Sequence, residues 1–176
     1  LDERRLEKSV HKVENIVGEM SEPITDFSEF LKPTKEKISF DVVDCVDSAI
    51  SLMEESINLH KIKINIVCDT ERKAYGYYND MTHVIFNLLN NARDAIVDAH
   101  PDERNIAVKV SDEGDMIRIS VFNTGEGIDP QYSQRIFEPY FTTREESGGT
   151  GLGLYISRCI VEDRLNGSIS MKNVKG

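Results

Sequence analysis

A run of polar side chains follows one face of the helix that the sequence predicts over residues 80–99. At about 100° per residue, apolar side chains share one face, and amides with a carboxylate lie opposite. Asparagine is a poor helix former, because its amide competes with the backbone for hydrogen bonds. Amide oxygens are neutral, hard ligands that bind a Mg²⁺ already carrying phosphate oxygens without repelling those oxygens. The pattern therefore indicates either an ordinary solvated face or a ligand site. Its polar members are His83, Asn87, Asn90, Asn91 and Asp94, and its apolar members are Ile85, Leu88, Leu89, Ala92, Ile96 and Ala99.

Two glycine-rich segments follow, and each lies where a backbone could approach a ligand closely. Residues 123–128 (NTGEGI) come directly after a predicted strand, and residues 148–154 (GGTGLGL) come directly before a predicted helix. Glycine permits close approach, and free N–H groups at a helix start bind phosphate oxygens. Each segment alone is also compatible with an ordinary turn or helix start. Neither matches the P-loop, and the second is not a dinucleotide fingerprint because it follows a polar loop.

The elements that must position these segments alternate along the chain. Helices are predicted over residues 41–58, 80–99, 130–137 and 151–164, strands over 62–66, 105–111, 116–122 and 167–172, and a polar loop over 142–151. Asn79 or Asp80 is expected to cap the long helix, and residues 112–115 to form a tight hairpin. Hairpins mixed with helices predict an α+β fold in which helices cover one face of a sheet.

Residues 1–36 are predicted to form a separate, long coiled-coil-like helix. Apolar residues recur in steps of four and three between residues 6 and 31, which is a heptad seam with charges beside it. Pro23 lies inside the seam and is expected to kink the helix. A narrow apolar stripe needs a partner, so we expect a homodimer or a helical bundle, with packing on the chain's own domain as the alternative. The seam consists of Leu6, Val10, Val13, Val17, Met20, Ile24, Phe27 and Leu31.

The composition excludes several classes of protein. The formal net charge of −10 repels phosphate backbones, so no nucleic-acid partner is expected. A hydrophobic share of 39% suffices for a core, and no apolar run approaches the roughly 20 residues of a membrane span. We therefore expect a cytoplasmic chain, with any membrane anchor elsewhere in the full-length protein. Because the chain begins with Leu1 and not Met, we also expect it to be a fragment. The 3 cysteines form no close-spaced pair and indicate a reducing compartment.

Four segments, taken in order, resemble the sequence boxes of sensor histidine kinases. Residues 83–95 (HVIFNLLNNARDA) resemble the N box and residues 123–128 the G1 box. Residues 136–143 (IFEPYFTT) resemble the F box, and residues 149–154 (GTGLGL) the G2 box. The order and spacing are those of the family, which makes the combined resemblance highly specific.

This resemblance implies a two-layer α/β sandwich of the gyrase, chaperone, kinase and mismatch-repair (GHKL) ATPase type, with a mixed sheet and helices on one face. Residues 37–176 would be the catalytic, ATP-binding domain, with its final strand truncated. Residues 1–36 would be the second helix of the hairpin that dimerises and carries the phosphoacceptor histidine.

The resemblance also implies a site for ATP and Mg²⁺. Asn91 would hold Mg²⁺, Asn87 would support the phosphates and Asp94 would face the nucleotide or its water. Asn123 would bind the adenine amino group. Arg144 would lie near the γ-phosphate, with a solvated lid charge as the alternative. The other residues placed at the nucleotide are Gly125, Gly127, Ile128, Phe141, Thr142, Thr143, Gly149, Thr150, Gly151, Leu152, Gly153 and Leu154, with residues 142–149 as a lid and Phe141 as its latch.

Two departures from the family pattern bear on function. Asn123 stands where the family usually has Asp, and an amide both donates and accepts, so discrimination between ATP and GTP is expected to weaken. The phosphoacceptor histidine is missing, because His11 is followed by Lys12 instead of an acidic residue and lies on the element that matches the second hairpin helix. The chain is therefore expected to be the kinase core of a two-component sensor. It would bind Mg-ATP and transfer the γ-phosphoryl group to a histidine outside the chain, upstream of a response regulator, without phosphorylating itself.

Two other functions remain compatible with the sequence. A GHKL-type ATPase that hydrolyses ATP would carry Glu where Asn87 stands, because the attacking water needs a base. A non-enzymatic, dimeric regulatory module with a degenerate nucleotide site would not need the glycines of residues 123–128 and 149–154. Sustained hydrolysis would favour the first alternative, and absence of nucleotide binding would favour the second.

Overall fold

The computed structural model describes residues 36–144 and 150–174, all within the second of two compact units, Thr34–Gly176. The helical seam predicted over residues 6–31 lies outside the described residues. The division of the chain at residue 36 into a hairpin helix and a catalytic domain stays a prediction.

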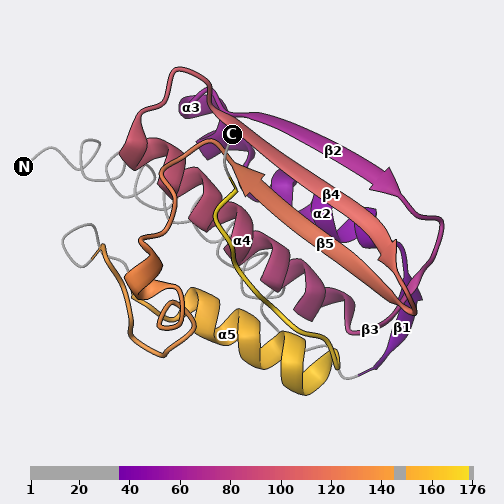
Figure 1. Ribbon diagram of the computed structural model, residues 1–176. Helices are drawn as coiled ribbons and strands as arrows, with labels where there is room; N and C mark the ends of the chain where they lie inside the picture. The colour runs from indigo at the N-terminus through magenta and orange to yellow at the C-terminus, as the bar shows by residue number, and fades with distance from the viewer. Residues whose placement is uncertain (1–35, 145–149, 175–176) are drawn as a thin grey trace, which may run out of the picture. The chain divides into compact units, whose positions relative to one another are not determined.

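A three-stranded mixed sheet forms one layer of this unit (Figure 1). Strand β2 (Lys63–Asp69) pairs in parallel with β4 (Asn105–Glu113), and β4 pairs antiparallel with β5 (Met116–Asn123). A second, two-stranded sheet pairs β1 (Ile38–Phe40) antiparallel with β3 (Ala74–Gly76). The sheet is therefore mixed, as the resemblance implies.

Helices form the second layer. In Figure 1, α2 (Val42–Ser51) and α4 (Tyr78–Ala99) lie along one face of the three-stranded sheet, and α5 (Gly153–Cys159) lies beside α4. The short helix α3 (Glu54–Leu59) leads from α2 into β2. This two-layer α+β arrangement confirms the predicted fold class.

The core fills the space between the helices and the sheet. Each large aliphatic side chain buried there contributes about 1.5–3 kcal/mol relative to exposure. Within residues 36–144 and 150–174, no helix is long and apolar enough to cross a membrane. The fully buried aliphatic side chains are Val42 and Val46 from α2, Ile85, Leu89 and Ile96 from α4, and Ile106, Val108 and Val110 from β4.

The start of α4 differs from the prediction. The helix begins at Tyr78 after Tyr77, whose side chain makes no capping hydrogen bond, so the expected capping by Asn79 or Asp80 is wrong. Asp80 is instead buried, at 7% exposure, and its carboxylate pairs with the guanidinium of Arg164. That guanidinium also lies 4.3 Å from the centre of the Tyr77 ring. The Asp80 carboxylate is therefore stabilised by its ion pair with Arg164 and does not cap the helix.

Several other elements also differ from the sequence predictions. The helix predicted over residues 41–58 is divided into α2 and α3, because the chain turns at Met53 to bury that side chain together with Ile57. The helix predicted over 130–137 is only a 3₁₀ turn, η1 (Pro130–Tyr132), followed by further turns. The helix predicted over 151–164 is α5 continued by a π-helical turn, η3 (Ile160–Arg164).

The strand predicted over residues 167–172 is absent. Among the described residues, no ladder of backbone hydrogen bonds joins this segment to β5. A strand depends on such a ladder and not on its own β-propensity, which is why the alternating pattern alone was insufficient.

Replacing Arg164 by Gln should destabilise the fold. The change leaves the buried Asp80 carboxylate without its charged partner, and an unsatisfied buried acceptor costs about 1–3 kcal/mol. Chemical denaturation at pH 7 measures the loss. The matched control is Arg158→Gln, which removes an exposed pair with Glu162 and should cost less than about 1 kcal/mol. Equal losses in the two variants would contradict the special role of the Asp80 pair.

Candidate functional site

Helix α4 separates a buried face from a polar one. Of the predicted apolar face, Ile85, Leu89, Ala92 and Ile96 are buried, Leu88 is half-buried and Ala99 is exposed. On the polar side, Asn87 is half-buried and Asn91, one turn further along, is exposed. These two amides share a face because residues four apart are neighbours on a helix surface.

The Asn87 amide links α4 to the beginning of α5. Its Nδ2 donates to the Gly153 carbonyl oxygen and to the Ser157 Oγ, each at 3.3 Å. The carbonyl accepts only, so the amide nitrogen and not the oxygen must face α5. The Asn87 nitrogen therefore faces α5, which leaves Oδ1 directed away from these two acceptors. In this arrangement the Asn87 oxygen could support phosphates through a cation or a water.

The side chains of Asn90 and Asn91 differ in their hydrogen bonding. Asn90 Nδ2 donates to the Phe86 carbonyl of its own helix at 3.1 Å. The Asn91 side chain makes no hydrogen bond to any other residue in the described part of the chain. Asn91 therefore keeps its amide oxygen available, as a metal ligand requires.

The G1-like loop is fixed against α4. A Cβ on Gly125 would lie 2.4 Å from the Ala95 carbonyl carbon and 2.7 Å from the Ile96 nitrogen, so only glycine fits at this contact. Asn123 Oδ1 accepts from the Gly125 N–H at 2.9 Å. Thr124 Oγ1 donates to the Glu103 carbonyl at 2.6 Å. The loop that follows β5 is thus held by its contact with α4 and by its hydrogen bond to the segment before β4.

The F-like and G2-like segments pack against each other. Gly151 has φ +65°, and a Cβ there would lie 2.5 Å from the Tyr140 carbonyl carbon. The Phe141 ring lies 5.4 Å from the Tyr132 ring and 4.5 Å from the Arg135 guanidinium carbon. The predicted latch residue therefore packs on the turns that precede it, while Gly151 permits close approach of the two backbones.

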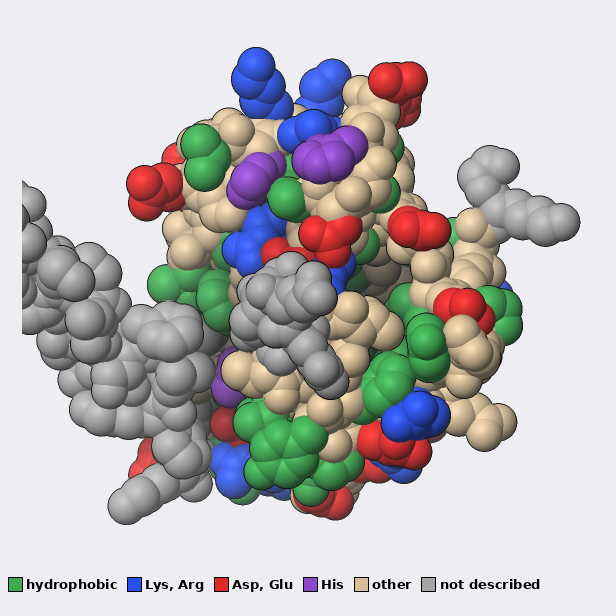
Figure 2. Space-filling view, turned by 90° about the vertical axis from the view of Figure 1, so that its left-hand side faces the viewer, with side chains coloured by type: hydrophobic (Ala, Val, Ile, Leu, Met, Phe, Trp, Pro, Cys, Tyr) green, Lys and Arg blue, Asp and Glu red, His purple; other side chains and the backbone are tan. Residues whose placement is uncertain are grey.

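Arg144 is held by carboxylates of α4. Its Nη1 lies 3.2 Å from Asp94 Oδ2, and its Nε lies 2.6 Å from Asp98 Oδ2. Asp94 Oδ1 also accepts from Arg93 Nε at 2.8 Å. The guanidinium is thus engaged in ion pairs, and a phosphate would have to compete with both carboxylates for it. Acidic and basic side chains likewise lie next to each other on the face drawn in Figure 2.

Other predicted residues make different contacts. Ile128 N–H donates to Asn173 Oδ1 at 3.0 Å, and Asn173 Nδ2 donates to the Ile128 carbonyl at 2.6 Å. A Cβ on Gly127 would lie 2.9 Å from the same Asn173 oxygen. Thr142 Oγ1 accepts from the Arg144 N–H at 3.0 Å. Thr143 and Thr150 are exposed, Leu152 and Leu154 are half-buried, and Gly149 lies outside the described residues.

Burial is the main cause of the pKa shifts of two side chains near these helices. It lowers the pKa of His83, although the Asp80 charge opposes the shift, so the imidazole is neutral at pH 7. It raises the pKa of Cys45 to about 12, so the thiol stays protonated. Neither side chain supplies a charge to the polar face of α4.

The donor set on α4 fits Mg²⁺ carried by phosphates. Within residues 36–144 and 150–174, no three His, Cys, Asp or Glu side chains gather as a metal cage. Mg²⁺ usually takes only one or two protein oxygens and keeps waters and substrate phosphates as its other ligands. The amide oxygens of Asn87 and Asn91 are suitable donors of that kind.

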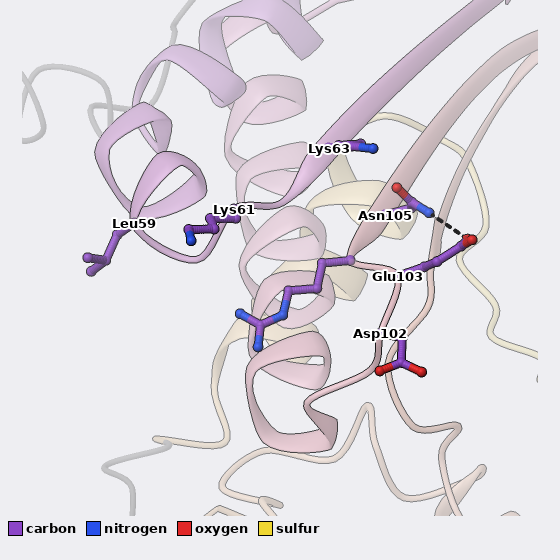
Figure 3. A pocket seen from close by; sticks show the side chains of 7 residues that line it. Leu59, Lys61, Lys63, Asp102, Glu103 and Asn105 are labelled. Atoms are coloured by element: carbon purple, nitrogen blue, oxygen red, sulfur yellow. Dashed lines mark hydrogen bonds between the residues drawn. The ribbon is translucent and has the colours of Figure 1, made fainter.

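A hollow of about 510 Å³ lies at a different place, between the end of α3, the start of β2 and the α4–β4 connection (Figure 3). It contains none of the amides of α4, and its side chains have mixed charge. Arg104 Nη1 there donates to the His60 carbonyl at 3.0 Å. We therefore do not assign this hollow to the nucleotide. Its lining residues are Leu59, Lys61, Lys63, Asp102, Glu103, Arg104 and Asn105.

Sequence reasoning did not identify Ser157, Asp98 or Asn173. Ser157 follows Gly153 by one helical turn, and Asp98 follows Asp94 by one turn, so helical spacing was the available signal. No comparable signal connects Asn173 with residue 128, which lies far away in the sequence.

Comparison with known proteins identifies the family. The family described as "Histidine kinase-, DNA gyrase B-, and HSP90-like ATPase" matches residues 76–176. The chain belongs to this ATPase family. Within it, the chain is 32% identical over 174 residues to the two-component sensor PprA of Pseudomonas aeruginosa, covering 96% of this chain and 18% of PprA. It is 31% identical to the sensor histidine kinase ZraS of Escherichia coli K12, covering 87% of this chain and 32% of ZraS.

Solved structures agree with this assignment. The catalytic domain of histidine kinase ThkA matches this ATPase-family chain with a TM-score of 0.69 and 30% identity, covering 80% of this chain and 89% of the ThkA chain. ThkA in complex with the response regulator TrrA matches with a TM-score of 0.64 and 25% identity, covering 99% and 49% of the two chains. The predicted resemblance to sensor histidine kinases is thereby confirmed. The chain spans less than a third of the length of PprA and of ZraS.

Replacing Gly125 by Ala should displace the G1-like loop from α4. The added methyl group would overlap the Ala95 carbonyl, and such overpacking costs about 1–3 kcal/mol. Backbone amide NMR should show changed signals for Ala95 and Ile96. The control is Gly114→Ala, where a Cβ meets nothing within 4 Å and only the φ of +60° is unfavourable. That variant should leave both signals in place. Unchanged Ala95 and Ile96 signals in Gly125→Ala would contradict the contact.

Proposed function

We propose that this domain binds Mg-ATP beside α4 and delivers the γ-phosphoryl group to a histidine outside the chain, as the kinase core of a two-component sensor. The observation that carries the proposal is the meeting of three segments on one helix. The loop 123–128 packs on α4 at Ala95, Arg144 reaches Asp94, and the start of α5 is joined to Asn87. The polar face of α4 is thus bordered by the loop 123–128, by the start of α5 and by the Arg144 guanidinium.

The proposed roles follow from these contacts. Asn91 and the Asn87 oxygen would hold Mg²⁺, which when bound neutralises phosphate charge and aligns the phosphates. The glycine segment that opens α5 would offer N–H groups to the phosphates. Asn123 would contact the purine ring, and Arg144 would stabilise the γ-phosphate after leaving its carboxylate partners.

The transfer itself needs little covalent chemistry from this chain. A neutral imidazole nitrogen attacks the γ-phosphorus in line while the bond to the β-phosphate oxygen breaks, so that electrons move to ADP. The residues of this chain orient the triphosphate and exclude water from the γ-phosphate. The acidic residue that orients the imidazole would accompany the acceptor histidine outside the chain.

The identity of residue 87 separates transfer from hydrolysis. A hydrolysing relative needs a carboxylate to take the proton of the attacking water. The Asn87 amide cannot act as that base, and its nitrogen is directed to α5. Sustained release of phosphate from ATP by this chain would therefore favour the hydrolytic alternative over the kinase.

The proposed partners come from the sequence pattern and from the relatives. A homodimer through residues 6–31 would bring the acceptor hairpin and the catalytic domain together. The complex of ThkA with TrrA supports a response regulator as the protein that receives the phosphoryl group next. We place the domain in the cytoplasm, where ATP and response regulators are available.

Replacing Asn91 by Ala should weaken Mg-dependent binding of ATP by about tenfold or more, because hydrogen bonds and ligand contacts to charged groups contribute about 1.5–3 kcal/mol. Calorimetric titration with ATP, with and without Mg²⁺, measures this difference. The matched control is Asn90→Ala on the same helix, whose side chain donates to the Phe86 carbonyl. Asn90→Ala should bind as the wild type does. Equal affinities of the Asn91→Ala variant and the wild type would remove Asn91 from the site.

Replacing Asn123 by Asp should raise the preference for ATP over GTP about fivefold or more, since one hydrogen bond to a base edge is worth about 1 kcal/mol or more. Asn123 Oδ1 already accepts from Gly125, which leaves its Nδ2 donor for the purine. A carboxylate offers a second acceptor to the adenine amino group and repels the guanine oxygen. Competition between the two nucleotides gives the ratio, and an unchanged ratio would show that residue 123 does not read the base.

A further inference from the structure

Ser157 is a fully buried polar residue in the middle of α5, with an exposure of 0%. It lies outside all four segments that resemble sensor-kinase boxes. Its Oγ–H donates to the Gly153 carbonyl at 2.9 Å, and its Oγ accepts from Asn87 Nδ2 at 3.3 Å. A buried hydroxyl usually has its donor and acceptor capacity satisfied, and here the partners are the first residue of α5 and an amide of α4.

These two bonds fix the orientation of the Asn87 amide. Gly153 O and Ser157 Oγ lie on one helix, four residues apart, and both accept from the Asn87 amide nitrogen. Rotating the amide by 180° would set the Asn87 Oδ1 against the Gly153 carbonyl oxygen, and the two oxygens repel each other. The Ser157 Oγ–H would then be the one group of this pair able to donate to Oδ1. One orientation is therefore strongly preferred, with the nitrogen toward α5.

We propose that Ser157 is a positioning residue that holds the Asn87 nitrogen toward α5, so that Oδ1 is offered to the ligand bound beside α4. The inference rests on the proposed function for the identity of that ligand. An offered oxygen binds Mg²⁺ or the water on it. Ser157 thereby favours binding of the metal complex of the nucleotide.

The nucleotide-free chain tests the contact itself. In Ser157→Ala, the Asn87 side-chain amide loses one acceptor, and its N–H signals should exchange with solvent about two- to tenfold faster, as expected for one hydrogen bond. The control is Ser48→Ala on α2, which removes another hydroxyl contact, 2.7 Å from Tyr78 Oη, and should leave the Asn87 signals unchanged. Unchanged Asn87 exchange in Ser157→Ala would overturn the inference, whatever the nucleotide result.

Calorimetry with ATP tests the consequence. Ser157→Ala should weaken binding about two- to tenfold with Mg²⁺ present and by less without it, while a merely structural change weakens both alike. In an Asn87→Ala background, Ser157→Ala should have no further effect, because the residue it positions is gone. An equal loss in both backgrounds, or an equal loss with and without Mg²⁺, would overturn the inference. A wild-type chain that binds no nucleotide would overturn the proposed function and the ligand role of Ser157, with the Asn87 exchange still reporting the contact.

Discussion

Helix α4 packs against the core on one side and contacts three separate segments on the other. Its aliphatic face is buried in the core through Ile85, Leu89 and Ile96. The opposite surface has no sheet to pack on, and its contacts are made by loop 123–128, by Arg144 and by the start of α5. The geometry of the site therefore depends on where one helix lies, and the strands serve mainly to hold that helix in place.

Electrostatics add a second constraint. The chain carries a formal net charge of −10, and Asp94 and Asp98 lie on the helix that would meet a triphosphate. An anionic ligand is unfavourable beside these carboxylates unless cations accompany it. Mg²⁺ supplies such charge, and neutral amides at positions 87 and 91 add none of the repulsion that carboxylates would. The pairing of Arg144 with both aspartates keeps the guanidinium close to the site while neutralising it, so a nucleotide has to draw Arg144 away from them.

Local patterns predicted part of this architecture, and tertiary contacts decided the rest. The spacing of apolar residues predicted the buried side of α4, and the four boxes predicted which segments would lie around it. Asp80 was expected to cap α4, because Asp is common at helix starts, but its partner Arg164 lies 84 residues away and no local rule connects the two. Asp98 pairs with Arg144 from a segment 46 residues further along the chain, and no local pattern connects the two. The orientation of Asn87 depends on a hydroxyl in another helix, which no spacing within residues 83–95 could indicate. The pattern of residues 167–172 favoured a strand, yet a strand exists only where a neighbouring backbone pairs with it.

The most direct test of the account is a crystal structure with a non-hydrolysable ATP analogue and Mg²⁺. The account predicts the triphosphate between α4 and the start of α5, with Mg²⁺ bound to the Asn91 oxygen and the purine beside Asn123. It would be contradicted by an analogue bound elsewhere, or by a polar face of α4 that stays covered by the protein's own side chains at saturating nucleotide.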